Sequence, residues 1–160
     1  MNIKLSRGYT ARVSREDYVR VVDAGPWFAH VDSKKKTVYA ERNVQRADGS
    51  WTMQKLHRFL LGLTDPKVLG DHKDGDGLNN LRSNLREANP MQSQRNRGMQ
   101  SNNSTGVSGV SWNTHAAKYE VHVKLNGKKK HLGLFSPLED AEAAIIGAKK
   151  LLYGEFVRAL

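Results

Sequence analysis

Cysteine is absent from this sequence of 160 residues. Its absence excludes a disulfide framework and a zinc site with thiolate ligands. A bound metal ion would therefore need histidine, carboxylate, amide or hydroxyl ligands. The sequence also lacks a signal-peptide pattern and any apolar run near the ~20 residues that cross a bilayer. We expect a cytosolic protein that is not inserted in a membrane.

Acidic residues are few relative to basic ones, with 16 Asp and Glu against 26 Lys and Arg and a net charge of +10. Such a charge predicts a polyanionic partner, and nucleic acid first, because neutralising phosphates releases counterions. A long basic amphipathic helix, which would favour an anionic membrane surface, is missing. Residues 1–103 and 104–160 each carry an excess of basic residues, which indicates a long footprint rather than a basic tail.

The chain length suffices for one ordinary domain or two very small ones. Residues 1–56 are typical of β-structure, because short apolar runs such as Tyr18–Val22 and Thr37–Ala40 are separated by turn signals such as Asp48-Gly49. Residues 98–108 are uncharged and rich in Gly, Ser and Asn, which predicts a linker.

The segment between these stretches predicts a short helix from Leu56, a strand over 68–72, a polar loop and a helix from Pro90. The chain beyond the linker predicts three strands near 109–113, 118–125 and 129–135. Asn126-Gly127 is the hairpin turn, and a helix capped by Ser136 and ended by Gly154 follows. One face of that helix is expected to be apolar, through Ala141, Ala144, Ile145, Ala148 and Leu152.

Asp71 and His72 end the predicted strand over 68–72, with Asn84 twelve residues after His72 and Asn96 twelve further on. A strand, loop, strand and helix would gather them in a ββα arrangement around one divalent metal ion and a phosphodiester. His72 suits the base that deprotonates water, since the ordinary histidine pKa is about 6.5, and Asp71 suits Mg²⁺. Asn84 is expected to orient the His72 ring or to pin the loop.

Three arginines, Arg86, Arg95 and Arg97, are expected to bind flanking phosphates. The alternative to a catalytic site is an ordinary turn, in which Asp-Gly and Asn-Asn serve the backbone alone. The spacing of these residues leaves both interpretations open.

Several separated segments occur in a specific order: Leu56-His57-Arg58, Asp71-His72-Lys73-Asp74-Gly75, Asn79-Asn80, Ser83-Asn84-Leu85-Arg86 and Gln94-Arg95-Asn96-Arg97. Together, over roughly residues 50–100, they resemble the HNH endonucleases of bacteriophages, which are homing-type, metal-dependent DNA-cutting enzymes. The resemblance implies that His72 is the general base, that Asp71 binds Mg²⁺ or Mn²⁺, and that Asn84 supports the active-site loop.

One position departs from that family, where a second metal ligand is an Asn nine residues after the position of Asn84. This sequence has Ser93 there. Ser93 could bind the metal ion through its hydroxyl, Asn96 could replace it, or the site could be impaired. We interpret His57 as a structural residue packed beneath the site. The remaining histidines, at 30, 115, 122 and 131, show no metal-ligand spacing with each other.

The segment over 118–124 alternates, so that Tyr119, Val121 and Val123 are expected to pack on the helix. The opposite face is polar, and either binds DNA or is simply solvated. It carries Lys118, Glu120, His122 and Lys124, continued by Lys129 and His131. Residues 106–153 resemble the AP2 DNA-binding domain, which implies that this face enters the major groove. Trp112 is either a core residue or a DNA contact, and we favour the core.

The sequence thus predicts an α+β chain, with an HNH nuclease domain over 1–97 (ββα-metal core about 66–97), a linker over 98–108 and an AP2-like domain over 109–160. The predicted partner is double-stranded DNA, without a membrane or a small-molecule substrate, and the chain is a monomer or a dimer. One rival function is non-catalytic, sequence-specific DNA binding by a protein derived from a nuclease. RNA binding ranks last, because no aromatic platform for stacking bases is evident.

Overall fold

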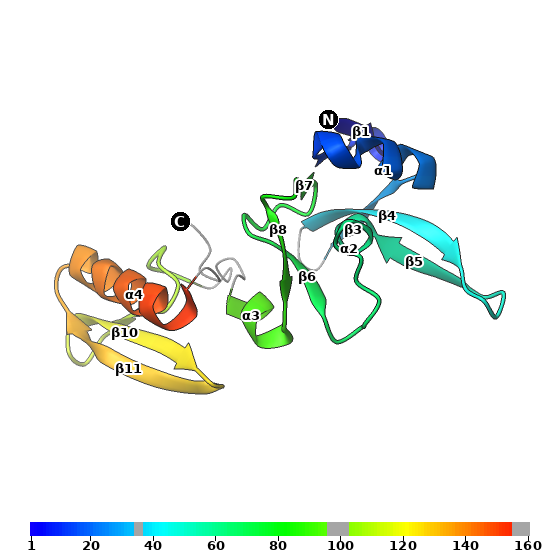
Figure 1. Ribbon diagram of the computed structural model, residues 1–160. Coiled ribbons are helices and arrows are strands. Elements are labelled where there is room, and N and C mark those ends of the chain that lie inside the picture. Colours follow the sequence, from blue (N-terminus) through cyan, green and yellow to red (C-terminus); the bar gives the residue numbers. More distant parts are fainter. Residues whose placement is uncertain (34–36, 96–102, 155–160) are drawn as a thin grey trace. The chain divides into compact units, whose positions relative to one another are not determined.

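A computed structural model describes residues 1–33, 37–95 and 103–154 (Figure 1). Backbone contacts divide the chain into two compact units, Met1–Gln94 and Arg95–Leu160. Each unit has its own cluster of buried apolar side chains. The fold is α+β, which confirms the class expected from the sequence.

The first unit holds three small sheets, ordered β1-β2-β7, β3-β4-β5 and β6-β8. Its strands are β1 (Asn2–Lys4), β2 (Thr10–Val13), β3 (Phe28–Asp32), β4 (Thr37–Gln45), β5 (Trp51–Lys55), β6 (Leu69–His72), β7 (Asn79–Asn80) and β8 (Leu85–Ala88). Its helices are α1 (Tyr18–Ala24), α2 (Leu56–Leu61) and α3 (Pro90–Arg95), with short 3-10 turns at η1 (Ser6–Gly8) and η2 (Arg15–Asp17).

The prediction of β-structure over Tyr18–Val22 is wrong, because this run lies in α1. Only Val21 of the helix is buried, whereas Val19 and Val22 are exposed. An apolar run of five residues does not distinguish a helix from a strand by its periodicity. The helix is anchored at Val21, whose carbonyl accepts a hydrogen bond of 2.8 Å from the Trp27 indole.

The turn expected at Asp48-Gly49 lies between the antiparallel strands β4 and β5, and Gly49 adopts a positive φ of 81° there. The chain then passes directly into α2, where Leu56 and Leu60 are buried in the core of the first unit. This helix ends at Gly62 in the left-handed conformation.

The strands β6 and β8 pair antiparallel, with Asp71 opposite Arg86 and His72 opposite Leu85. Helix α3 follows β8, and Pro90 is its first residue, as the sequence predicted. Asn89 and Gln92 cap the helix reciprocally, since the side chain of each accepts a hydrogen bond from the backbone N–H of the other.

The second unit is a three-stranded antiparallel sheet and a helix, in the sheet order β11-β10-β9. Its elements are β9 (Val110–Asn113), β10 (Lys118–Leu125), β11 (Lys128–Phe135) and α4 (Leu138–Tyr153). The strands lie close to the predicted ranges. Asn126 and Gly127 both have a positive φ, 49° and 80°, as a two-residue hairpin turn requires. Val121 and Val123 are buried in the core cluster that also holds Ala141 and Ile145 of α4.

Three details of the second unit differ from the prediction. The cap of α4 is Pro137 rather than Ser136, without a side-chain hydrogen bond, and Glu139 and Asp140 are the acidic residues of the first turn. Leu152 is exposed, and the neighbouring Tyr153 is buried instead. Tyr153 ties the helix end to the sheet, because its hydroxyl donates a hydrogen bond of 2.5 Å to the Lys124 carbonyl.

The expected core position of Trp112 is also wrong, because this side chain is 48% exposed. Trp112 of the edge strand β9 lies opposite Tyr119 of β10, and the two rings meet edge to face with centroids 4.9 Å apart.

Residues 103–108, assigned to a linker from their composition, pack in the second unit instead. Val107 is buried in the core of that unit. The Asn103 amide donates to the Val107 carbonyl at 2.9 Å, and the Thr105 hydroxyl donates to the Val110 carbonyl at 3.0 Å. The polar composition led to the wrong prediction of a linker, because these side chains form hydrogen bonds with the backbone of a tight turn. Residues 98–102 of the predicted linker are not among the described residues.

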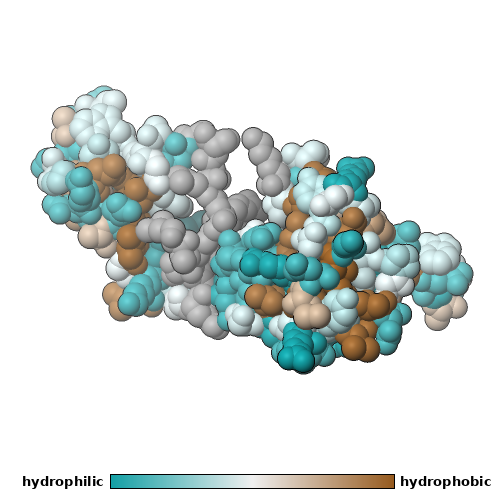
Figure 2. All heavy atoms as spheres, turned by 90° about the horizontal axis from the view of Figure 1, so that it is seen from above, coloured by the Kyte–Doolittle hydropathy of each residue, from teal (hydrophilic) through white to brown (hydrophobic). Residues whose placement is uncertain are grey.

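Hydrophobic and hydrophilic residues are interspersed on the face of each unit that Figure 2 draws. The large exposed apolar side chains include Trp51 and Met53 of β5 and Trp112 of β9. Within the part of the chain that the structure describes, no helix has both the length and the apolar character needed to cross a bilayer.

Candidate functional site

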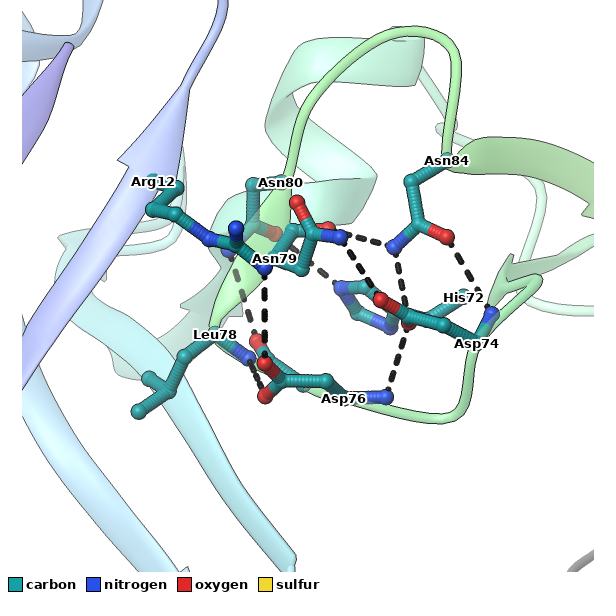
Figure 3. Close-up of polar contacts among 9 residues, drawn as sticks. Arg12, His72, Asp74, Asp76, Leu78, Asn79, Asn80 and Asn84 are labelled. Carbon is teal, nitrogen blue, oxygen red and sulfur yellow. Dashed lines mark hydrogen bonds and ion pairs between the residues drawn. The ribbon is translucent and has the colours of Figure 1, made fainter.

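Asp71 and His72 lie at the end of β6 and are almost completely buried, at 9% and 5% exposure. The Nε2 atom of His72 lies 3.2 Å from the side-chain oxygen of Asn80, which is fully buried on β7 (Figure 3). Asn80 is held in turn by a hydrogen bond of 3.4 Å to the Gly77 carbonyl. The ring of His72 is therefore oriented by a residue beyond the polar loop.

The polar loop between β6 and β7 is pinned by Asn84. Its amide nitrogen donates to the Asp74 carboxylate at 2.9 Å and to the Asn79 carbonyl at 2.8 Å, and its oxygen accepts from the Asp74 backbone at 3.1 Å (Figure 3). Asp74 also accepts a hydrogen bond of 2.6 Å from the Asn79 amide. Asn84 therefore pins the loop, which is one of the two roles expected for it. The other role, contact with the His72 ring, belongs to Asn80.

The partner of Nε2 determines which nitrogen of His72 is basic. An amide oxygen can only accept a hydrogen bond, so the neutral ring carries its proton on Nε2 and its lone pair on Nδ1. Burial lowers the pKa of His72, although the bond to Asn80 and the nearby Asp74, Asp71 and Asp76 carboxylates oppose that effect. His72 is thus a neutral base near pH 7.

His57 lies beneath His72, as the sequence predicted, with the two rings edge to face and their centroids 4.8 Å apart. Burial, followed by the charges of His72, Lys55 and Arg58, holds the pKa of His57 well below 6.5. Gly70 makes room for this ring, since a Cβ atom there would lie 2.5 Å from the His57 Cδ2 atom. His57 is therefore a neutral ring on which the His72 ring packs.

Asp71 is paired with Arg86, its cross-strand neighbour. The Nε and Nη2 atoms of Arg86 donate to the same oxygen of Asp71 at 3.0 and 2.9 Å, and both side chains are about nine-tenths buried. The expectation that Arg86 binds a flanking phosphate is not supported by this geometry, because its guanidinium already serves a buried carboxylate. Strand pairing across β6 and β8 is what brings the two together.

Asp71 lies at the position that the sequence assigned to a metal ion. Asp71 offers a carboxylate, and Mg²⁺ in proteins often uses one or two carboxylates while it retains water molecules. Ser93 lies half-buried in α3, and Arg95 ends that helix, with its side chain outside the described part. The other expected residues of this region, Asn96 and Arg97, lie outside the described residues.

The second candidate surface is the sheet face of the second unit opposite the buried Val121 and Val123. Lys118, Lys124, Lys129 and His131 are exposed there, and His122 is half-buried. Lys124 lies directly opposite Lys129, and His122 directly opposite His131. The predicted polar face therefore exists, with a strip of positive charge at the end next to the hairpin turn.

This face also corrects the expectation for the histidines. His122 and His131 come together, with ring centroids 5.1 Å apart, and the Nε2 atom of each lies 3.6 Å from the same Glu120 oxygen. Burial and the charge of Lys129 lower the pKa of His122. The signal was present in the sequence, because a two-residue turn at 126–127 pairs residue 122 with residue 131.

Asn80 is the functional candidate that the sequence did not single out. Asn80 entered the sequence-based prediction only within Asn79-Asn80, as part of a turn and as one segment of the HNH resemblance, without a role of its own. The parallel pairing of β7 with β2 is what buries it. Pairing between segments so far apart in the chain leaves no local sequence signal.

The site and fold define a two-unit α+β protein with a buried Asp-His pair in the first unit and an open polar sheet in the second. Comparison with known proteins shows that the chain is similar to Protein 3.8 of Escherichia phage T7, with 32% identity over 88 residues that make up 55% of this chain and 72% of that protein. The chain belongs to the family of that phage protein. No family model and no solved structure matches the chain.

Proposed function

We propose that this chain is a metal-dependent endonuclease of the HNH homing type, which hydrolyses phosphodiester bonds of double-stranded DNA by nicking. In this proposal β6, the polar loop, β8 and α3 form the ββα-metal core. The observation that carries it is the adjacency of the buried Asp71 and His72 at the end of β6, with the His72 ring held through its Nε2 atom by the buried Asn80.

His72 acts through its Nδ1 atom, which takes a proton from the attacking water. Asn84 keeps the polar loop in place beside it, through the three hydrogen bonds described above. Positioned general bases of this kind contribute about 10²- to 10⁴-fold to a rate.

Asp71 would hold Mg²⁺ or Mn²⁺, with Ser93 or Asn96 as the second protein ligand. The metal ion, when bound, supplies charge stabilisation at the leaving 3′-oxygen. Arg86 neutralises part of the Asp71 charge and fixes the carboxylate. The expected products carry 5′-phosphate and 3′-hydroxyl ends.

The second unit would grip DNA as an AP2-like domain, with its polar sheet face in the major groove. Lys118, Lys124 and Lys129 are the exposed cations of that face. Arg95 and Arg97 would bind flanking phosphates. The kinship with a phage protein supports a phage origin and action in the cytoplasm of a bacterial host.

Plasmid relaxation tests the enzyme. Supercoiled plasmid is incubated with the protein, with and without Mg²⁺ or Mn²⁺, beside His72→Ala and a matched control, His115→Ala, at an exposed histidine of the second unit. Metal-dependent nicking that is lost in His72→Ala and retained in His115→Ala is expected.

Tight DNA binding without cleavage in either metal would overturn the enzyme and favour a non-catalytic DNA-binding protein. Ser93→Asn, which restores the family's ligand, is then the informative variant. Recovery of cleavage in Ser93→Asn would identify Ser93 as the residue that impairs the site.

A further inference from the structure

The open sheet face of the second unit carries a three-residue cluster: Glu120 and His122 from β10 and His131 from β11. Their ligand atoms all lie within 4.8 Å of one another. Among the residues that the structure describes, this is the group of three His or acidic side chains with the spacing of a metal site. It lies in a different unit from Asp71 and His72.

We propose that Glu120, His122 and His131 bind a divalent transition-metal ion of the zinc type. Zinc–nitrogen and zinc–oxygen distances of about 2.1 Å place tetrahedral ligand atoms about 3.4 Å apart. The Glu120 oxygen lies 3.6 Å from the Nε2 atom of each histidine. Small side-chain rotations therefore suffice to close the cluster around an ion.

The chemistry of the three groups selects the class of ion. Two imidazoles and one carboxylate suit Zn²⁺ and its neighbours in the first transition row, whereas Mg²⁺ and Ca²⁺ prefer oxygen ligands throughout. Three protein ligands leave a fourth position for water or an anion. That position faces solvent, because α4 packs on the opposite face of the sheet, against Val121 and Val123.

The backbone that presents the cluster is held firmly. The regular pairing that follows the turn at 126–127 places His131 directly opposite His122, and a β-bulge shifts the register only beyond this pair, between Val121 and His122. On the other side, the His122 N–H donates to the Gly109 carbonyl at 2.8 Å. A Cβ atom at Gly109 would lie 2.7 Å from the His122 carbonyl oxygen, so this approach requires glycine. His122 is thus fixed between two neighbouring segments.

Calorimetric titration of the full chain with ZnCl₂ tests the site. Two variants, His122→Gln and His131→Gln, are each expected to weaken Zn²⁺ binding at least about tenfold. The control His115→Gln is expected to bind as the unaltered chain does. Asp71→Asn separates this site from the proposed nuclease centre, and Zn²⁺ binding to the second unit is expected to survive it.

Zn²⁺-dependent shifts of the His122 and His131 ring signals in NMR spectra provide a second readout, and amide spectra report whether each variant is folded. Zinc binding that disappears in Asp71→Asn but persists in the two histidine variants would overturn the site. So would the absence of any Zn²⁺-induced shift of these rings. Neither result depends on DNA cleavage, so failure here is distinct from failure of the nuclease.

Discussion

Asn80 is the residue on which the orientation of His72 depends, since its oxygen is the partner of Nε2. Removing that amide would leave Nε2 without this acceptor, although the ring still packs against Tyr39 and His57. A buried polar group without its partner costs about 1–3 kcal/mol. The effect of this residue is therefore expected in both activity and stability.

Asn80→Ala is expected to lower metal-dependent nicking about 10- to 100-fold, as loss of a residue that orients a ligand or base commonly does. Plasmid nicking measures the first effect, and urea denaturation monitors whether the variant is folded. The matched control is Asn43→Ala, at an exposed position of β4. Full activity in a folded Asn80→Ala protein would contradict the role of Asn80.

The buried His57 links stability to pH. Its pKa in the folded protein is well below 6.5, so the unfolded chain takes up a proton at His57 before the folded one does. Stability is then retained above about pH 6.5 and lost as the pH falls below it. Lowering the pH from 7.5 to 5.5 is expected to reduce the free energy of unfolding of the first unit.

His57→Phe keeps a planar ring and removes this titration. Urea denaturation at the two pH values is expected to show a smaller loss of stability on acidification than in the unaltered chain. The low pKa of His72 leaves a residual loss. An unchanged pH dependence would show that His57 does not carry the effect.

At the scale of elements, the polar loop is positioned by its close approach to β4. A Cβ atom at Gly77 would lie 2.3 Å from the Val38 carbonyl oxygen and 2.7 Å from the Tyr39 ring. The loop can therefore lie this close to the sheet only with glycine at that point. The contact also places Asn80, three residues later, against His72.

Gly77→Ala is expected to destabilise the first unit by about 1–3 kcal/mol, the usual cost of overpacking. The control is Gly147→Ala in α4, where a Cβ atom meets nothing within 4 Å. That substitution is expected to stabilise its helix by about 0.5–1 kcal/mol. Chemical denaturation measures the free energy of unfolding of both variants. Equal effects would contradict the close packing of Gly77 against β4.

For the whole molecule, separate cores predict separate folding. The first unit buries Leu56, Val13 and Val21, and the second buries Val121, Val123 and Ile145. The second unit also needs the turn before its first strand, because Val107 lies in its core. Its boundary should therefore fall near residue 103.

A fragment over 103–160 is expected to fold alone and to be more stable than a fragment over 109–160, by about 1.5–3 kcal/mol for the burial of Val107. NMR amide spectra compare each fragment with the full chain, and urea denaturation measures the difference. Equal stability of the two fragments would contradict the boundary. Failure of both to fold would contradict independent units.

The sequence by itself determined the features that depend on local rules. Alternation and the Asn126-Gly127 turn predicted the hairpin of the second unit. The register of that turn joins His122 to His131, although the prediction did not bring these two histidines together. Pro90 marked the start of α3, and Asp48-Gly49 marked the turn between β4 and β5. These signals are carried by neighbouring residues, so no distant contact is needed to read them.

Only the tertiary structure decided features that depend on distant pairing. The run at Tyr18–Val22 became a helix in which Val21 is buried and Tyr18 packs against the same core. Asp71 met Arg86 across β6 and β8, and Asn80 met His72 after β7 paired with β2. Burial converts such meetings into fixed geometry, since a buried polar group must find a partner. The residue types indicated a site at Asp71 and His72, and the packing of separate segments determined which side chains contact them.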